Sequence, residues 1–397
     1  MKKKLLAGTL VLSALMFAGC NSEADQSSGN GEEDGTSEED LLAEEAELEV
    51  ATEPIRINPD IDDETEIYSE GPQGETAESA HSLELGVEEA EEISEGEYTA
   101  AISMHYAGND WARAQVNGLQ ETFAKMGIEV IAVTDGQFSV EKQASDIETL
   151  LARDPDILVS IPVDPVSSAN AYRNAVDAGV ELVFMDNVPE GFSPGEDYVS
   201  VVSADNYGNG VAAAHSMAEE IGEEGEIGVI YHDADFFVTG QRVEGFETTI
   251  KEEYPNIEIV ERDGIAEPED GEEVASGMFT RNSNLDGLFV VWDVPAEGAL
   301  SASRTAGLDE LVVTTIDLGS GVALDMARDQ NIKGLGAQLP YDQGVAEAIL
   351  AGYALLDKEA PPYVAVPALE VTRENLLESW ELVYNEEAPS EIQESME

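Results

Sequence analysis

The 397-residue sequence has little cysteine and little positive charge. It contains one cysteine, Cys20, so the chain has no internal disulfide and no thiolate cluster for a metal ion. Only 18 lysine and arginine residues stand against 85 aspartate and glutamate residues, which gives a formal charge of −67. A field of this sign repels phosphate backbones and anionic membrane surfaces, and it therefore argues against nucleic acid as a partner.

Several catalytic signatures are also absent. The sequence has no His-Glu-x-x-His, no Gly-x-Ser-x-Gly and no phosphate-binding Gly-x4-Gly-Lys-Ser/Thr motif, and it holds only four histidines. The glycine pairs Gly208-Asn-Gly210 and Gly319-Ser-Gly321 lack the fingerprint of a dinucleotide site. No cofactor and no metal site are therefore expected. Paired carboxylates could still hydrolyse a glycoside, and this enzyme alternative would be revealed by product formation.

The first twenty residues have the pattern of an export signal. Met1 is followed by three lysines, and Leu5 to Gly19 is an apolar run too short for a comfortable membrane span. The run ends in Phe17-Ala-Gly-Cys20, which resembles the lipobox of bacterial lipoproteins. We predict a signal peptide over 1–19 and a lipid on Cys20, which would anchor the protein at the extracytoplasmic face of the cell membrane. The alternative is an ordinary buried cysteine beside a signal boundary.

An acidic stretch follows Cys20. Residues 21–97 carry 28 acidic residues against Arg56 alone, and they are rich in serine and glycine with short apolar islands such as Ile55-Arg-Ile57. This composition is typical of a self-repelling, disordered spacer. We predict a disordered tether over 20–97, with a docking motif for a partner as the alternative.

From Tyr98 onward, short apolar runs alternate with amphipathic helical stretches. The runs predicted as strands are 98–104, 128–133, 157–161, 180–185, 227–231, 257–260, 288–291, 311–316 and 332–336. Strands separated by helices of 10–15 residues indicate parallel sheets built from βαβ units. The number of strands exceeds what one sheet holds comfortably, so we predict an α/β protein with two doubly wound lobes.

Polar or aromatic residues stand directly after most of these strands. They are Asp186-Asn187, Asp205-Asn206, His232-Asp233, Trp292-Asp293, Asp317 and Gln338. Open α/β sheets bind ligands beyond the carboxyl ends of their strands, so this pattern predicts a ligand cleft. The alternative for any one of these residues is an ordinary helix cap or turn.

The residue types suit a neutral polyhydroxy compound. Carboxylates such as Asp186, Asp205 and Asp317 accept hydrogen bonds from neighbouring hydroxyls. Arg242, Asn109 and Gln338 supply donors. Trp111 and Trp292 could cover the apolar C–H faces of a sugar ring, and we expect Trp380 to be a packing residue.

The order of these pieces resembles the ribose-type solute-binding proteins of bacterial ABC importers, which share the type I periplasmic-binding fold with sugar-responsive repressors. The resemblance covers about residues 98–375. Its pieces are Asn109-Asp-Trp111, Asp186-Asn187, Ser203-Ala-Asp-Asn206, Arg242-Val-Glu-Gly-Phe246, Trp292-Asp293, Ile316-Asp317 and Gln338-Leu-Pro340.

The resemblance implies which residues would contact ligand. They are Asn109, Trp111, Asp186, Arg242, Asp317 and Gln338, with Asp205 near the first crossing between lobes. Two positions depart from the family: Asn187 stands where arginine is frequent, and Trp292 where asparagine is frequent. These departures leave the sugar open and speak against a plain ribose site.

The resemblance also implies lobes that are discontinuous in sequence. One would combine 98–204 with 339–366, and the other 205–338 with 367–397, joined by a hinge of three crossovers. Ligand would bridge the lobes and stabilise their closed form, which the permease would recognise.

We therefore predict a monomeric, lipid-anchored protein that captures a monosaccharide or polyol and delivers it to an ABC permease. A lipid-anchored sensor of a sugar or autoinducer, reporting to a receptor kinase or chemoreceptor, is the alternative output. A repressor is disfavoured because an export signal and an acidic stretch stand where a basic helix-turn-helix would be. The acidic excess outside the cleft predicts a saline environment, where salt screens self-repulsion.

Overall fold

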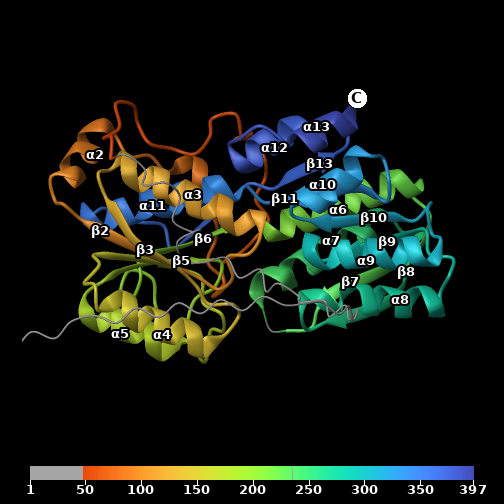
Figure 1. Cartoon of the computed structure of the whole chain (residues 1–397), viewed down its shortest axis with the longest axis horizontal. Helices are drawn as coiled ribbons and strands as arrows, with labels where there is room; N and C mark the ends of the chain where they lie inside the picture. Colours follow the sequence, from red (N-terminus) through yellow and green to blue (C-terminus); the bar gives the residue numbers. More distant parts are fainter. Residues whose placement is uncertain (1–47, 235) are drawn as a thin grey trace, which may run out of the picture. The chain divides into compact units, whose positions relative to one another are not determined.

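A computed structural model describes residues 48–234 and 236–397 (Figure 1). The predicted signal peptide, Cys20 and the first part of the predicted tether lie outside these residues. Within them the chain forms two β-sheets flanked by helices, as alternating strand and helix patterns predict. The predicted α/β class with parallel sheets is confirmed.

The first sheet has seven strands in the order β1-β12-β6-β5-β4-β2-β3, and every neighbouring pair is parallel. Its strands are β1 (Glu78–Ser79), β2 (Thr99–Met104), β3 (Glu129–Asp135), β4 (Ile157–Ser160), β5 (Glu181–Met185), β6 (Ser200–Ala204) and β12 (Tyr363–Val366). The helices of this half are α2 (Val87–Ser94), α3 (Asp110–Lys125), α4 (Val140–Leu151), α5 (Ala169–Ala178) and α11 (Pro340–Leu355). We call this part of the chain the first half.

The second sheet has six strands in the order β13-β11-β10-β9-β7-β8, and only β13 runs antiparallel to its neighbour. Its strands are β7 (Gly225–His232), β8 (Ile257–Ile265), β9 (Gly287–Val290), β10 (Val312–Ile316), β11 (Ile332–Ala337) and β13 (Leu369–Thr372). The helices of this second half are α6 (Asn206–Ile221), α7 (Phe237–Glu253), α8 (Gly271–Arg281), α9 (Asp293–Ala306), α10 (Ser320–Ala327), α12 (Leu376–Tyr384) and α13 (Ser390–Met396).

The strands are apolar throughout because both faces of the sheet are covered. In β5, Leu182 and Phe184 join one apolar cluster, while Val183 and Met185 join another. In Figure 1, α4 and α5 lie on one side of the first sheet, and α3 and α11 lie on the other. The two faces of β5 therefore bury separate cores.

The chain passes between the sheets three times. Strand β6 belongs to the first sheet, and α6 after it packs on β10 and β11 of the second. Strand β11 belongs to the second sheet, and α11 after it packs on β5 and β6. The third passage joins β12 to β13. Asp205 and Gln338 stand directly after β6 and β11, so both side chains lie at crossings.

The prediction of a disordered tether up to residue 97 is wrong for its second part. Ile55, Ile57 and Leu85 are buried in the same apolar cluster as α3 and α11, and β1 pairs with β12 at the edge of the first sheet. The prediction failed because it relied on the average composition of an acidic stretch. Each short apolar segment within that stretch is ordered because it packs on an apolar surface that distant parts of the chain provide. Helix α2 closes this segment.

Candidate functional site

A cavity of about 330 Å³ lies where the carboxyl ends of strands from both sheets meet. Seven of the nine predicted ligand residues line it: Asn109, Trp111, Asp186, Arg242, Trp292, Asp317 and Gln338. Four come from the first half or the second crossing and three from the second half, so a ligand in the cavity would touch both halves. This is the position that open α/β sheets use for ligands.

Arg242, Asp317 and Gln338 form a hydrogen-bonded group in the cavity wall. The Arg242 guanidinium donates from Nη1 to Asp317 Oδ2 at 3.2 Å, and Gln338 Nε2 donates to Asp317 Oδ1 at 2.8 Å. A further bond from Arg242 Nε to Asn206 Oδ1, at 2.9 Å, fixes the plane of the guanidinium. All of these side chains are buried, so the group presents a charged, oriented surface inside the protein.

Asp186 faces this group from the end of β5. Ser203 Oγ donates to Asp186 Oδ1 at 2.6 Å. Burial raises the pKa of Asp186 to about 6, although the Ser203 hydroxyl and the charge of Arg242 both act in the opposite direction. The carboxyl group is therefore ionised at neutral pH, and it changes its protonation in mildly acidic solution.

Asp186 and Asp317 both have left-handed backbone conformations, with φ of 56° and 72°. Such conformations cost energy for residues other than glycine, and they gather at functional sites. Each aspartate ends a buried strand, so the turn aims its side chain out of the sheet and into the cavity.

The two predicted tryptophans lie in the lining. Trp111, in the first turn of α3, is buried, and Trp292 precedes α9 and is half-buried. Asn109 caps α3 by accepting a hydrogen bond from the Ala112 amide at Oδ1, 2.9 Å away. Its Nδ2 is therefore the part of the amide that can donate to a ligand.

Three polar atoms of the lining are buried without a hydrogen-bond partner among the described residues. They are Trp111 Nε1, His105 Nδ1 and Gln338 Oε1. Leaving such atoms unpaired costs free energy, so their presence in a cavity favours a ligand or water that bonds them.

The sequence-based prediction omitted several aromatic residues of the lining. These are His105, Tyr106, Phe138 and Phe236, whereas His232, which directly follows a predicted strand, was among the residues expected at the cleft and also lines the cavity. Burial lowers the pKa of His105 to about 4, and burial together with Arg242 lowers the pKa of His232. Both imidazoles are consequently neutral at neutral pH. His105 and Tyr106 directly follow β2, so the rule that identified Asp186 would have found them too.

Two predicted residues do not line this cavity. Asn187 is buried beside Asp186, and neither polar atom of its side chain has a partner among the described residues. Asp205 caps α6 by accepting from the Gly208 amide, and it also accepts bonds from the backbone of Tyr68 and Ser69. The prediction that Asp205 faces ligand is not supported, because its carboxylate is occupied by the chain's own amides.

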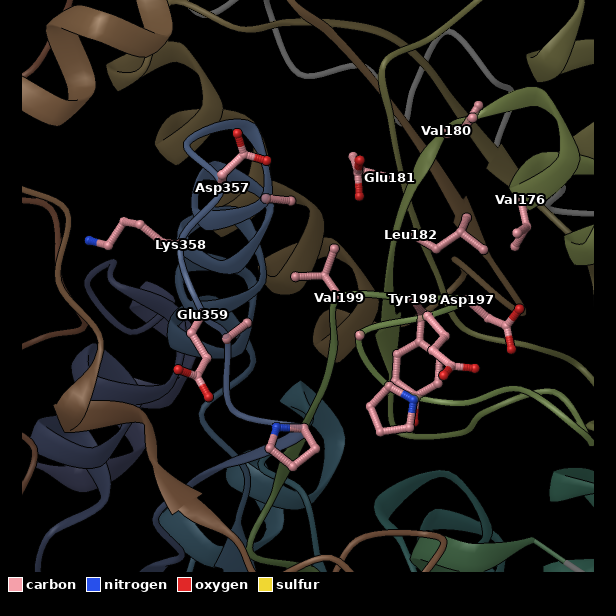
Figure 2. A pocket seen from close by; sticks show the side chains of 17 residues that line it. Val176, Val180, Glu181, Leu182, Asp197, Tyr198, Val199, Asp357, Lys358 and Glu359 are labelled. Atoms are coloured by element: carbon pink, nitrogen blue, oxygen red, sulfur yellow. The ribbon is translucent and has the colours of Figure 1, made fainter.

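A second hollow, of about 680 Å³, lies at the opposite ends of the first sheet's strands (Figure 2). Glu181 and Leu182 at the start of β5 line it, together with Asp357 and Lys358 after α11. Lys358 points away from the β5 side chains in Figure 2, and its ammonium bonds Glu89 Oε1 at 2.7 Å. The charged side chains that line this hollow are mostly acidic, and its polar groups do not converge on one point. It is therefore a weaker candidate for a ligand site than the cavity at the carboxyl ends of the strands.

Among the described residues, no group of three or more histidine, cysteine, aspartate or glutamate side chains is arranged to hold a metal ion. Within 48–234 and 236–397, no helix is both long and apolar enough to cross a membrane.

Comparisons with known proteins agree with this geometry. A family model described as a periplasmic binding protein domain matches residues 100–360. The ribose import binding protein of Bacillus subtilis is 25% identical over 272 residues, which cover 68% of this chain and 86% of that protein.

Solved structures of solute-binding proteins share the fold. One from Agrobacterium vitis, bound with alpha-D-tagatopyranose, has a TM-score of 0.66 at 21% identity and covers 73% of this chain and 100% of its own. One from Actinobacillus succinogenes, with bound D-allose, has a TM-score of 0.63 at 24% identity and covers 70% of this chain and 99% of its own.

Proposed function

Because the chain belongs to the periplasmic binding protein domain family, we propose that it captures a monosaccharide or polyol outside the cytoplasm and delivers it to an ABC permease. The observation that carries the proposal is the buried group of Arg242, Asp317 and Gln338 facing Asp186 across the cavity. A relative that imports ribose, and related structures that hold tagatose and allose, support the same ligand class.

The charges of the cavity suit a neutral ligand. Asp164, Asp186, Glu267 and Asp317 bring four carboxylates, and Arg242 brings the cationic side chain of the lining. Adjacent hydroxyls can donate to the carboxylates and accept from the guanidinium, so a polyol satisfies both signs at once. An anionic ligand would meet four like charges and one opposite charge, which disfavours it.

Delivery to a permease requires a bound form that differs from the free form. The cavity is lined by both halves, and the chain joins them only through three crossings. A ligand that bonds both walls stabilises the closed arrangement by its greater affinity for that arrangement. The permease would then read the closed surface.

A sugar panel tests the ligand class. We would titrate pentoses, hexoses, polyols and cyclitols into the purified protein and follow calorimetry and tryptophan fluorescence. Trp292→Ala should abolish the fluorescence response while far-ultraviolet circular dichroism stays unchanged, because Trp292 lines the cavity from a half-buried position. No calorimetric signal from any member of the panel would contradict the proposal.

We also propose that Cys20 carries a lipid that holds the protein at the outer face of the cell membrane. Support comes from the apolar run before Cys20 and from the absence of any other cysteine. Metabolic labelling with an alkynyl fatty acid should mark the native chain, and Cys20→Ala should remove the label and release the protein into the medium. Labelling that persists in the variant would contradict this assignment.

A further inference from the structure

The cavity is richer in aromatic side chains than a sugar ring requires. The first half contributes His105, Tyr106, Trp111 and Phe138, and the second half contributes His232, Phe236 and Trp292. A sugar ring has two apolar faces, so two aromatic rings are enough to cover it. Five rings of the lining remain without a role in holding a simple sugar.

These rings form a connected series that reaches across the two halves. Phe138 lies 5.0 Å from both Tyr106 and His105, measured between ring centroids. His105 faces Phe236 of the second half at 6.4 Å with nearly parallel planes, and His232 in turn lies 5.3 Å from Trp292. The series is therefore one apolar surface shared by both halves.

The polar group of the lining and the phenyl ring of Phe138 differ in burial. Asp186, Arg242, Asp317 and Gln338 are all buried. The side chain of Phe138, in contrast, is 46% exposed. A ligand that binds the polar group through its hydroxyls would meet the aromatic surface with another part of its structure.

The backbone at Phe138 is held in an unfavourable conformation. Gln137 and Phe138 are consecutive residues with φ of 52° and 53°, a region that is unfavourable for residues other than glycine. Backbone bonds from Gly136 to Met104 and from Phe138 to His105, both 2.8 Å, hold the loop in place. The fold thus maintains strain that places an exposed phenyl ring beside the ligand cavity.

We propose that the preferred ligand carries an apolar substituent, such as the aglycone of an aryl or alkyl glycoside, which binds the aromatic surface around Phe138. This inference rests on the proposed function, because the hydroxylated part of the ligand still binds the group around Arg242 and Asp317. Covering a large apolar side chain contributes about 1.5–3 kcal/mol, so the substituent should strengthen binding about tenfold or more.

The experiment compares each free sugar with its glycosides. D-Ribose, D-allose, D-glucose and D-galactose would be titrated beside their methyl and phenyl glycosides by calorimetry. The phenyl glycoside of at least one sugar should bind about tenfold tighter than the free sugar, and Phe138→Ala should remove most of that difference.

Tyr68→Ala is the matched control, since Tyr68 is 49% exposed and lies outside the cavity lining. Free sugars that bind as tightly as their glycosides would overturn the aglycone proposal and leave the proposed function standing. An absence of binding by every sugar and glycoside would instead contradict the proposed function itself.

Residues 50–79 form a segment that we call the strap. The strap precedes the region that the family model matches, and it is attached to the first half at several points. The Ala51 amide donates to the Lys125 carbonyl of α3 at 2.8 Å, the Asn58 amide donates to Asp342 Oδ1 at 2.7 Å, and β1 pairs with β12.

The strap also binds the first crossing between the halves. Asp205 stands at this crossing and is fully buried. Its carboxylate accepts from the Tyr68 and Ser69 amides, both at 3.0 Å, and from the Ser69 hydroxyl at 2.8 Å. Ser69 Oγ accepts in turn from the Tyr207 amide at 3.0 Å, at the start of α6.

Neighbouring strap residues reach both halves. Gln241 of α7, in the second half, donates from Nε2 to the Glu70 carbonyl at 2.9 Å. Gln73 of the strap donates from Nε2 to the Phe192 carbonyl, in the first half, at 2.9 Å. A rotation of one half against the other changes the distance between these two attachment points, so at least one bond must stretch or break.

We infer that the strap braces the hinge and stabilises the arrangement of the halves described here, in which both halves line one cavity, and that it thereby raises ligand affinity by increasing the fraction of binding-competent protein. The brace acts through Ser69 and Asp205 at the crossing and through Gln241 on the second half. Each hydrogen bond contributes about 1 kcal/mol, which corresponds to about a fivefold change in the equilibrium between arrangements.

The double variant Ser69→Ala with Gln241→Ala tests the brace. The ligand-free variant should show a larger radius of gyration by small-angle scattering than the ligand-free wild type. The best ligand of the sugar panel should bind the variant at least about fivefold more weakly than it binds the wild type. If the double variant does not fold, Gln241→Ala alone can replace it, because this change affects a half-buried side chain. It should also increase the radius of gyration and weaken ligand binding.

Tyr353→Phe is the control, because the Tyr353 hydroxyl bonds Glu84 at 3.1 Å and this contact lies within the first half. It should leave scattering and affinity unchanged. Scattering curves and Kd values equal to those of the wild type in the hinge variants, or equal changes in Tyr353→Phe, would overturn the inference. The scattering result does not depend on knowing the ligand.

Discussion

Asp186 and Asp317 occupy matching positions in the two sheets. Asp186 follows β5, which pairs with β6, the strand that leads out of the first half. Asp317 follows β10, which pairs with β11, the strand that leads out of the second half. Both residues take positive φ, so the two halves present a carboxylate to the cavity by the same local device. Each half thus contributes one carboxylate at the end of a strand. Arg242 pairs with Asp317, and its charge also acts on Asp186.

Asp317→Asn should weaken both ligand binding and the fold. The substitution leaves the buried Arg242 guanidinium without its opposite charge, and breaking a buried pair of this kind costs about 3–5 kcal/mol. Urea unfolding measures the stability, and calorimetry with the best sugar of the panel measures the binding.

Asp329→Asn is the matched control, because Asp329 also has positive φ and pairs with a lysine, Lys333, at the surface. An exposed pair contributes about 0–1 kcal/mol, so this variant should remain close to the wild type. Equal losses in the two variants would show that the burial of the Arg242 pair has no special effect.

Ligand affinity should depend on pH through Asp186. The pKa of Asp186 is raised to about 6, so the carboxylate that accepts from hydroxyls is formed as the pH rises through this value. The association constant should therefore increase between pH 5 and 7 and then level off. Asp186→Asn should flatten this profile, which calorimetry in buffers of equal ionic strength can follow.

The same carboxyl group affects stability in the opposite direction. Its pKa is about 6 in the folded protein and near 3.8 when unfolded, so the folded state holds the proton more tightly. The stability that this group contributes is therefore fully present below about pH 4 and is lost, by about 3 kcal/mol, as the pH rises through 6. Asp342 lies outside the cavity, and burial also raises its pKa to about 6. Its contribution to stability therefore falls over the same pH range. Asp342→Asn should reduce this fall without changing the pH profile of binding.

Gly210→Ala should disturb the site through helix packing. A Cβ atom at Gly210 would lie 2.1 Å from the Arg242 carbonyl oxygen, so α6 and α7 must separate to admit it. Overpacking of this kind costs about 1–3 kcal/mol, and it displaces the segment that carries Arg242. We expect lower stability in urea and weaker sugar binding.

Gly240→Ala provides the comparison within α7. A Cβ atom at Gly240 meets no other atom within 4 Å, so alanine should stabilise the helix by up to about 1 kcal/mol. If Gly240→Ala destabilises the protein as much as Gly210→Ala does, close approach of the two helices is not the cause.

The melting temperature should rise with salt. With 85 acidic and 18 basic residues, the folded chain repels itself, and the Debye length shortens from about 8 Å at physiological ionic strength to about 3 Å at 1 M. Calorimetric scans between dilute buffer and molar NaCl should show the increase, and choline chloride at equal ionic strength should reproduce it. A constant melting temperature would contradict the proposed saline environment.

The sequence contained enough information for the parallel sheets and for most of the cavity lining. Apolar runs bounded by turns predicted the central strands, and the rule that ligands bind beyond carboxyl ends selected Asp186, Asp317 and Gln338. The same rule also selected Asp205, because a cap and a ligand contact look alike in sequence. The structure distinguishes them, because the Asp205 carboxylate accepts from the Gly208, Tyr68 and Ser69 amides and from the Ser69 hydroxyl.

Other features depend on contacts between distant residues. The strap could not be predicted, since Ile55 and Ile57 are buried in an apolar cluster that residues of α3 and α11 complete. Phe138 of the aromatic surface was missed for a different reason: it follows β3 after a short turn, and nothing in its neighbours reveals a strained backbone. Local patterns identify elements, whereas tertiary contacts decide which apolar islands become part of the core.

The order of attachments along the strap has a mechanical consequence. A pull on the chain before residue 50 loads the bond between Ala51 and α3 first, then the one between Asn58 and Asp342. Ser69, at the crossing, carries load only after both have parted. The contacts of Ala51 and Asn58 thus bear the force first. Tension applied at the chain's amino-terminal end therefore does not reach the crossing between the halves until both contacts have broken.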